Sequence, residues 1–231
     1  MTNFQKTVKY IAMAFAIFLT VSIIGGILSM FGLFGGFFSG DAVTEDVKTY
    51  SVSSEIQSLE VKINAADFTI KQGESFSVES NLKHLTVEDN NGILTIKETK
   101  KFANTYTGAV LTLYIPADTV FEKANIITGA GRLTVDSLSA STMNFELGAG
   151  EVTIDTLVAT SNIDIDGGAG KITISGGALH NLDLDMGVGQ LNLTSALTGE
   201  SDFDLGIGIV VRALPQREPL IGKRPSEISR Q

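Results

Sequence analysis

The chain has 231 residues, no cysteine and a net charge of −9 at neutral pH. The absence of cysteine excludes a disulfide framework, a lipoprotein anchor and a cysteine nucleophile. The charge is uneven, because residues 1–40 carry +2, residues 41–210 carry −14 (24 acids and 10 bases) and residues 211–231 carry +3. A strongly acidic central region argues against nucleic acid as a partner.

The first expected element is a membrane span. No charged residue occurs between Tyr10 and Gly40, and Tyr10–Phe31 alone would extend roughly 33 Å as a helix, enough to cross a bilayer. A buried core helix rarely runs so long without charge, and a cleaved signal peptide has a shorter apolar region followed by a small-x-small site, which is missing here. We therefore expect an uncleaved transmembrane helix within residues 10–38, with the lipid bilayer as its partner through Tyr10–Phe31.

Charges that flank the span predict its orientation. Lys6 and Lys9 precede the span, and acids follow it from Asp41 onward, so residues 1–9 are expected in the cytoplasm and the rest of the chain outside. Residues 39–57 are predicted to form a polar tether. The chain is thus expected to be a single-pass protein of the cell membrane with an extracytoplasmic C-terminal domain.

Residues 58–116 alternate apolar and polar residues as short strands do. Leu59–Ile63 and Phe68–Lys71 flank a corner of small residues. Asn91-Gly92 predicts a hairpin between two further strands, and Pro116 ends the last strand of this half. We expect this half to form irregular coils or a cap on the repeats that follow.

Residues 125–211 contain a repeat. Glycine pairs separated by one residue recur there at spacings of 19, 20, 19 and 19 residues, with short alternating runs on both sides. Stacked coils bury the apolar face that one short strand cannot bury alone. The predicted fold is therefore all-β, a parallel β-solenoid with coils of 19–20 residues over residues 58–210. Its predicted corners are Gly129, Gly131, Gly148, Gly150, Gly168, Gly170, Gly187, Gly189, Gly206 and Gly208.

Adding the period assigns side chains to columns along the solenoid. The predicted inward columns are Phe145, Ile165, Leu184 and Leu205, with slight slips at the corners, and then Val152, Ile172 and Leu191. The predicted outward columns are Thr134, Thr153, Thr173 and Asn192, and beside them Arg132, Glu151, Lys171 and Gln190. Alternating sign in the last column suits stacked neighbours.

Two further outward columns are acidic. They are Asp164, Asp183 and Asp202, which follow Asn144, and Asp166, Asp185 and Asp204, which follow Glu146. At strand spacing each vertical pair repels by about 0.9 kcal/mol in bulk water before salt screening. Ca²⁺ would offset this repulsion, because it takes several carboxylate oxygens. The alternative is a solvated face that prevents aggregation, so calcium is a hypothesis, and no other cofactor is expected.

No enzyme activity is expected. His84 and His180 lack the partners of a metal site or a triad, and no serine elbow is present. Gly167–Lys171 departs from a phosphate loop, because a strand pattern follows it instead of a helix. The enzymatic alternative is a glycan-acting carboxylate pair, Asp164 with Asp183, but stacking spreads these groups along a column.

Alternation fails after Val210. Residues 211–231 hold three of the four prolines and five bases against two acids. We predict a disordered basic tail there, and this leaves the last coil without the polar cover that solenoid ends need.

Several segments together resemble the bacterial putative-adhesin domain family of unknown function. They are the strand Leu59–Ile63, the step Asn91–Ile96, the strand end Leu113–Pro116 and the serial glycine coils. The resemblance covers about residues 54–210, and the tail from Arg212 departs from it. It implies a β-solenoid outside the membrane, sometimes linked with envelope stress responses in Gram-positive bacteria, and it supplies no catalytic residues.

Three functional hypotheses follow. The first is a membrane-anchored binding or structural module of the cell envelope, adhesin-like, which recognises a cell-wall polymer or an envelope membrane protein. The second is a regulatory component of an envelope-stress sensing system. The third, ranked lowest, is the glycan-acting enzyme.

Overall fold

The computed structural model describes residues 44–52, 55–99 and 108–212, which belong to a unit that spans Ala42–Gln231. The predicted cytoplasmic segment (1–9), membrane anchor (10–38) and most of the predicted tail (213–231) lie outside the described residues. Within these limits every regular element is a β-strand. None of the described residues belongs to a helix long and apolar enough to cross a membrane.

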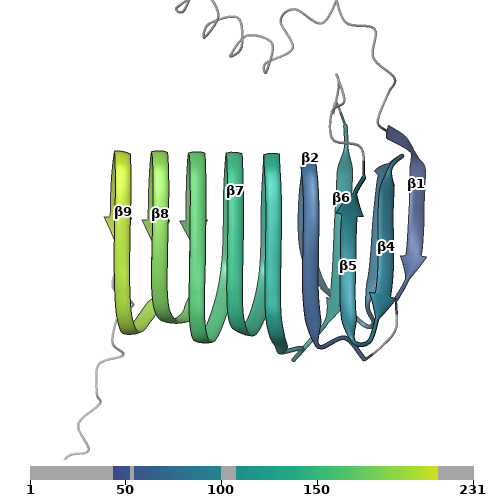
Figure 1. Cartoon of the computed structure of the whole chain (residues 1–231), viewed down its shortest axis with the longest axis horizontal. Coiled ribbons are helices and arrows are strands. Elements are labelled where there is room, and N and C mark those ends of the chain that lie inside the picture. Colours follow the sequence, from purple (N-terminus) through teal and green to yellow (C-terminus); the bar gives the residue numbers. More distant parts are fainter. Residues whose placement is uncertain (1–43, 53–54, 100–107, 213–231) are drawn as a thin grey trace, which may run out of the picture. The chain divides into compact units, whose positions relative to one another are not determined.

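The described strands form one sheet (Figure 1). Their bounds are β1 (Thr44–Ser51), β2 (Ser58–Gly73), β3 (Ser77–Leu82), β4 (Leu85–Asn90), β5 (Ile93–Glu98), β6 (Val110–Pro116), β7 (Phe121–Ile174), β8 (Gly177–Leu193) and β9 (Ala196–Arg212). The sheet order is β1-β3-β6-β2-β7-β8-β9, and β5 pairs with both β2 and β4.

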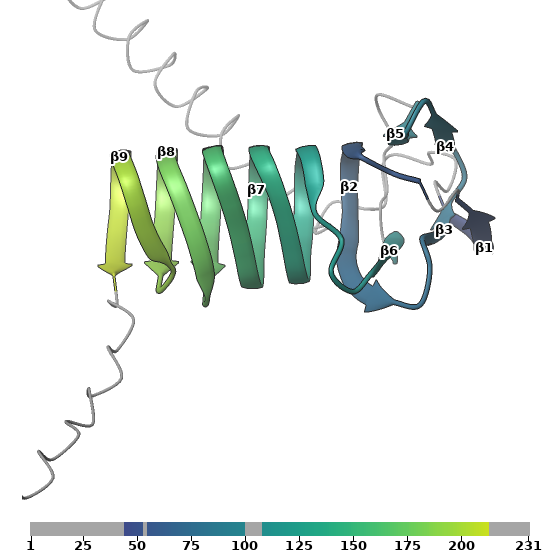
Figure 2. The same cartoon turned by 90° about the horizontal axis from the view of Figure 1, so that it is seen from below.

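β2, β7, β8 and β9 form the stacked parallel coils (Figures 1 and 2). β2 pairs in parallel with β7, β7 with β8, and β8 with β9. Asp164 lies opposite Asp183, and Asp183 lies opposite Asp202, so adjacent coils are offset by 19 residues here. The all-β, mostly parallel, solenoid-like architecture predicted from the repeat is confirmed.

Inward-facing side chains of successive coils stack into the core. Phe145, Ile165 and Leu184 are each at most 1% exposed. The next member of their column is Phe203, which lies opposite Leu184, whereas Leu205 lies opposite Met186. The assignment of Leu205 to this column was therefore wrong, because the register keeps the 19-residue offset and does not slip at the corner.

Antiparallel strands cover the N-terminal end of the coils. β5 and β6 pair in parallel with the two limbs of β2, while β4 is antiparallel to β5, β3 to β6, and β1 to β3. Asn91 and Gly92, with φ of 53° and 77°, form the turn between β4 and β5. Positive φ at both turn residues is the geometry that Asn-Gly favours, so the predicted hairpin is confirmed.

Two boundaries differ from the sequence prediction. Thr44–Ser51, inside the predicted tether of residues 39–57, forms the edge strand β1. Its sequence lacks the alternation of apolar and polar residues that marks a strand, and most of its side chains are exposed. Backbone pairing with β3 holds it in the sheet instead. At the other end the ladder continues past residue 210, because Val211 and Arg212 pair with Asn192 and Leu193.

Candidate functional surface

The predicted corner glycines lie in two files along the solenoid. In the first file, a Cβ on Gly148 would collide with the carbonyl oxygen of Gly129, one on Gly168 with that of Gly148, and so on through Gly187 and Gly206. The second file contains Gly131, Gly150, Gly170, Gly189 and Gly208, and each stacks on the one before it. The first residues of the two files stack on Asn64 and Ala66 of β2. Backbone therefore packs on backbone at this corner, where no side chain fits.

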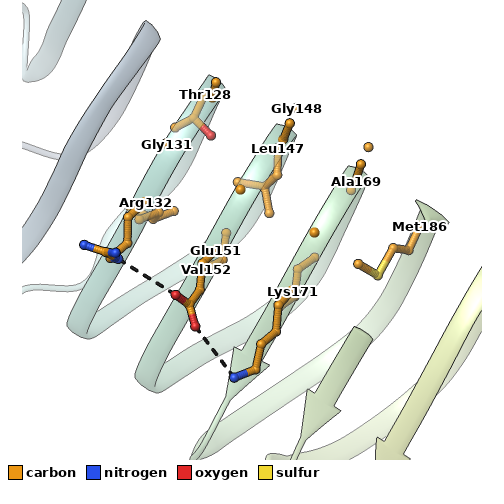
Figure 3. A pocket seen from close by; sticks show the side chains of 18 of the residues that line it. Thr128, Gly131, Arg132, Leu147, Gly148, Glu151, Val152, Ala169, Lys171 and Met186 are labelled. Carbon is orange, nitrogen blue, oxygen red and sulfur yellow. Dashed lines mark ion pairs between the residues drawn. The ribbon is translucent and has the colours of Figure 1, made fainter. Parts of the chain in front are cut away.

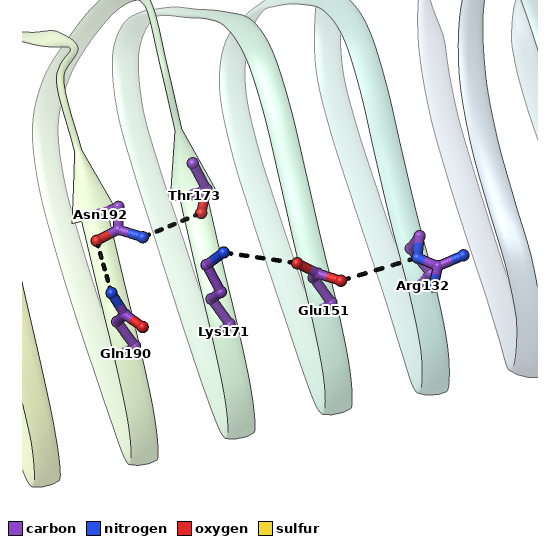
Figure 4. A network of polar contacts seen from close by, with 6 residues as sticks. All are labelled: Arg132, Glu151, Lys171, Thr173, Gln190 and Asn192. Atoms are coloured by element: carbon purple, nitrogen blue, oxygen red, sulfur yellow. Dashed lines mark hydrogen bonds and ion pairs between the residues drawn. The ribbon is translucent and has the colours of Figure 1, made fainter.

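On one side of the corner runs a charged ladder (Figure 4). Arg132 lies 3.8 Å from Asp67 and 3.9 Å from Glu151, and Glu151 lies 3.6 Å from Lys171. These side chains are 45–60% exposed, and exposed ion pairs contribute about 0–1 kcal/mol each. Sequence periodicity missed Asp67, because the β2-to-β7 offset is not a multiple of the repeat.

The charged ladder passes into a neutral one at the next coil. The Gln190 amide donates to Asn192 Oδ1 at 3.1 Å, and the Asn192 amide donates to Thr173 Oγ1 at 3.3 Å (Figure 4). Ion pairs thus link adjacent coils from Asp67 to Lys171, and the hydrogen bond from Asn192 to Thr173 links the coil of Lys171 to the next. This outer face is continuous over several coils.

On the other side of the corner the acidic columns lie in register. Asp164, Asp183 and Asp202 are neighbours on successive coils, as are Asp166, Asp185 and Asp204. Partial desolvation raises the pKa of Asp164, and the nearby carboxylates of Asp166 and Asp183 raise it further. Desolvation also raises the pKa of Asp185, with added repulsion from Asp183 and Asp204. Like charge therefore accumulates along this side.

A groove of about 690 Å³ follows the acidic side of the corner. Its charged lining is Lys62, Glu146, Asp166, Asp185 and Asp204. Lys62 comes from β2 and was missed by sequence reasoning, because only the pairing of β2 with β7 places it in the column that Glu146 continues. The groove spans several coils, so its shape suits an extended ligand better than a compact one.

The six aspartates of the calcium hypothesis do not converge. They occupy successive coils, and strands are about 4.8 Å apart. Among the residues that the structure describes, no group of three or more His, Cys, Asp or Glu side chains is arranged to hold a metal ion. Calcium binding by these columns stays a prediction.

A second hollow lies beneath the glycine corner (Figure 3). Its volume is about 20 Å³, and its lining includes Leu147, Val152 and Met186. A volume of this size holds about one water molecule. It offers no room for a substrate, so the groove and the outer face are the better candidates for recognition at this corner.

The groups considered for catalysis are dispersed. Asp164 and Asp183 lie side by side on adjacent coils within a longer column of carboxylates. His180 contacts Thr198 Oγ1 through Nδ1 at 3.0 Å, and His84 belongs to the turn between β3 and β4. General acid–base catalysis needs an acid and a base within hydrogen-bond reach of one reacting group, and the residues singled out from the sequence do not form such a set.

Comparison with known proteins gives a family match and distant structural matches. Residues 40–206 match the family model described as Toastrack DUF4097. No curated protein matches the chain. A "putative cell adhesion protein" from Clostridium sporogenes shares 10% identity and a TM-score of 0.46, covering 72% of this chain and 98% of its own. A "putative adhesin" from Bacteroides fragilis shares 14% identity and a TM-score of 0.37, covering 75% of this chain and 100% of its own.

A third solved structure is described as a "putative lipid binding protein", from Parabacteroides distasonis. It shares 12% identity and a TM-score of 0.33 and covers 76% of this chain and 98% of its own. Likenesses this distant carry no functional argument. The family model, in contrast, spans well over half of the chain and confirms the resemblance drawn from the strand Leu59–Ile63 and the glycine coils. The chain belongs to the Toastrack DUF4097 family.

Proposed function

We propose that this protein is a membrane-anchored module that displays its solenoid outside a bacterial cell membrane and acts there by binding or structural support, as an adhesin does. The observation that supports this most directly is the continuous outer face, where the ladder from Asp67 to Lys171 and the acidic columns run in register across the coils. Repeat proteins use extended surfaces of this kind to hold partners.

Recognition fits this surface better than catalysis does. On the acidic side, aspartates recur coil after coil, so a partner meets similar chemistry at each step from Asp164 to Asp202. An extended wall polymer, or an envelope membrane protein with an elongated contact surface, would match such a face. A catalytic centre instead needs different groups gathered around one reacting atom.

The membrane half of the proposal is supported by the sequence. Residues 10–40 carry no charge, Lys6 and Lys9 precede them, and acids follow from Asp41. This distribution favours a cytoplasmic N-terminus and an external domain.

Cysteine labelling in intact cells tests the proposed orientation. The natural chain has no cysteine, so each introduced thiol is unique. Gln190→Cys places a thiol at an exposed position of β8, and Thr2→Cys places one before the predicted span. A membrane-impermeant maleimide is expected to label Gln190→Cys in intact cells and Thr2→Cys only after lysis.

The matched control is Leu184→Cys, which places a thiol in the core of the same strand. It should remain unlabelled until the protein is unfolded. Labelling of Thr2→Cys in intact cells while Gln190→Cys is protected would reverse the orientation, and protection of both would place the solenoid inside the cell. Either result would end the proposal.

The binding half is tested by cosedimentation of the detergent-solubilised protein with isolated cell walls and, separately, with membranes stripped of wall. The proposal expects saturable binding to at least one of them. Replacing Glu151 and Lys171 with Gln, which removes charge from the ladder, should weaken binding if this face makes the contact. Absence of saturable binding to both materials would leave only a structural role.

A further inference from the structure

The two ends of the solenoid differ. Antiparallel strands cover the N-terminal end, where β3 and β4 lie against β6 and β5. At the opposite end, β9 pairs with β8 and with no other strand in the described part of the chain. Figure 2 shows β9 as the last described coil. Its outer edge presents backbone N–H and C=O groups that another strand could pair with.

The apolar interior also opens at this end. Leu184 and Met186 of β8 are 0% and 4% exposed, but their register partners Phe203 and Leu205 are only partly buried. The same change separates Leu179 from its partner, because Leu179 is buried and Leu197 is partly buried. A further strand with apolar inward residues would bury these side chains as each coil buries those of the coil before it.

Outward charge indicates what such a strand should carry. Asp202 and Asp204 are the last members of their columns, and each lies beside a coil that already carries Asp183 or Asp185. On the other side of the corner, the outward side chains Arg132, Glu151 and Lys171 of neighbouring coils alternate in charge and form ion pairs of 3.6–3.9 Å. A following strand with basic residues opposite Asp202 and Asp204 would repeat that arrangement, whereas an acidic one would extend the repulsion.

We propose that the outer edge of β9 binds an extended segment of another protein in which apolar residues alternate with Lys or Arg, so that this segment adds one strand to the solenoid. Its apolar residues cover Phe203 and Leu205, and its basic residues lie opposite Asp202 and Asp204. A second copy is the less suitable occupant, because its own edge carries the same acids. The site does not depend on membrane anchoring.

The exposed side of the same coil extends the apolar contact area. Ile207, Ile209 and Val211 are 73%, 66% and 51% exposed. In the coil before, the positions opposite Ile209 and Val211 are the polar Gln190 and Asn192. Apolar residues therefore replace polar ones at these two positions of the last described coil, and Ile207 continues an apolar position already present at the exposed Val188.

Three nine-residue peptides test the proposal by fluorescence anisotropy with full-length protein in detergent, using empty micelles as the blank. The first alternates Val with Lys, the second alternates Val with Glu, and the third has the composition of the first in two blocks. Only the first is expected to bind saturably. Its binding should slow hydrogen–deuterium exchange at the amides of residues 197–205 and should weaken as salt increases.

Paired substitutions locate the contact. Asp202→Asn/Asp204→Asn should weaken the binding of the Val/Lys peptide by about tenfold, because two opposite-charge cross-strand pairs are lost. Asp164→Asn/Asp166→Asn is the matched control, with the same columns and the same chemistry two coils away from the edge, and it should bind the peptide almost as the natural protein does.

Each alternative outcome overturns the proposal. Equal binding of the Glu peptide would show that charge does not matter, and equal binding of the block peptide would show that alternation does not matter. An equal loss of affinity in the Asp164/Asp166 control would show that the peptide contacts the whole acidic column and not the edge of β9. Self-association that protects β9 and excludes the peptide would make a second copy the occupant. Binding that is gained only when residues 213–231 are removed would make the chain's own following segment the occupant.

Discussion

At the scale of single residues, the tightest constraint is the contact of corner glycine with corner glycine. Gly150 has a φ of +146°, and its position leaves no space for a Cβ because of the Gly131 carbonyl oxygen. The 19- and 20-residue spacing predicted which glycines occupy the corner, since a Cβ collides in both files and positive φ adds a second constraint at Gly131, Gly150, Gly170 and Gly189. Spacing did not identify Asp67 or Lys62, because their places depend on how β2 pairs with β7.

Replacing Gly150 with Ala is expected to lower the free energy of unfolding by at least about 3 kcal/mol, because backbone strain and backbone collision add. Urea unfolding followed by circular dichroism measures the change. Gly108→Ala is the matched control: Gly108 also has positive φ (+73°), but no atom of the described residues lies within 4 Å of its Cβ position, so only about 1 kcal/mol of strain is expected. Equal losses would show that the collision is relieved by a small shift of the coil.

At the scale of elements, the coils are held by inward apolar columns while outward charge either alternates or accumulates. The sequence predicted the acidic columns correctly in register because strand side chains alternate with period two and the offset is 19 residues throughout the stretch that carries these aspartates. It failed for β1, which is mostly exposed and held by backbone pairing, and for Leu205, where the assignment assumed a slip that the ladder does not make.

The acidic columns predict a dependence of stability on pH. The pKa of Asp164 is raised above its usual 3.8, so the folded protein binds more protons than the unfolded chain just above pH 3.8. The contribution of this group to the free energy of unfolding therefore falls as pH rises through that window. Asp164→Asn is expected to stabilise the protein by about 0.5 kcal/mol at pH 7. Near pH 3 it should change the stability little, because the protonated aspartate and the asparagine that replaces it are both neutral.

Thermal melts of natural and Asp164→Asn protein across pH 3 to 7 measure this difference. Asp46→Asn, an exposed position of β1 outside the acidic columns, is the control and should show no such gain. If Asp164→Asn is less stable than the natural protein at pH 7, a cation or a partner charge must neutralise the column. Added Ca²⁺ in the same melts then tests the calcium hypothesis directly.

At the scale of the whole solenoid, stability is expected to depend on distance from the open end. Each coil of a repeat protein is stabilised mainly by its two neighbours, and β9 has one described neighbour. The sequence predicted an uncapped last coil from the loss of alternation after Val210. The antiparallel strands at the N-terminal end were harder to predict from the sequence, because only the Asn91-Gly92 turn indicated strands that reverse direction.

Leu184→Ala is therefore expected to cost about 2–5 kcal/mol, the range for a buried leucine, and Phe203→Ala less than that, although Phe is the larger side chain. Leu184 is fully buried, and its column neighbour Phe203 is only partly buried. Urea unfolding of both variants measures the order. A larger loss for Phe203→Ala would mean that something covers β9 in solution.

The offset of 19 or 20 residues between successive corner glycines also limits how proteins of this design can change in length. Removing a complete 19-residue turn, such as the step from Asp183 to Asp202, would leave every remaining side chain on its present face. Removing a single residue from within one strand would move the side chains beyond the cut in that strand from the inner face to the outer face, or the reverse. Whole-turn insertions and deletions are thus the changes of length that keep every side chain on its face, and the reversed strands at the N-terminal end supply a fixed origin from which the turns are counted.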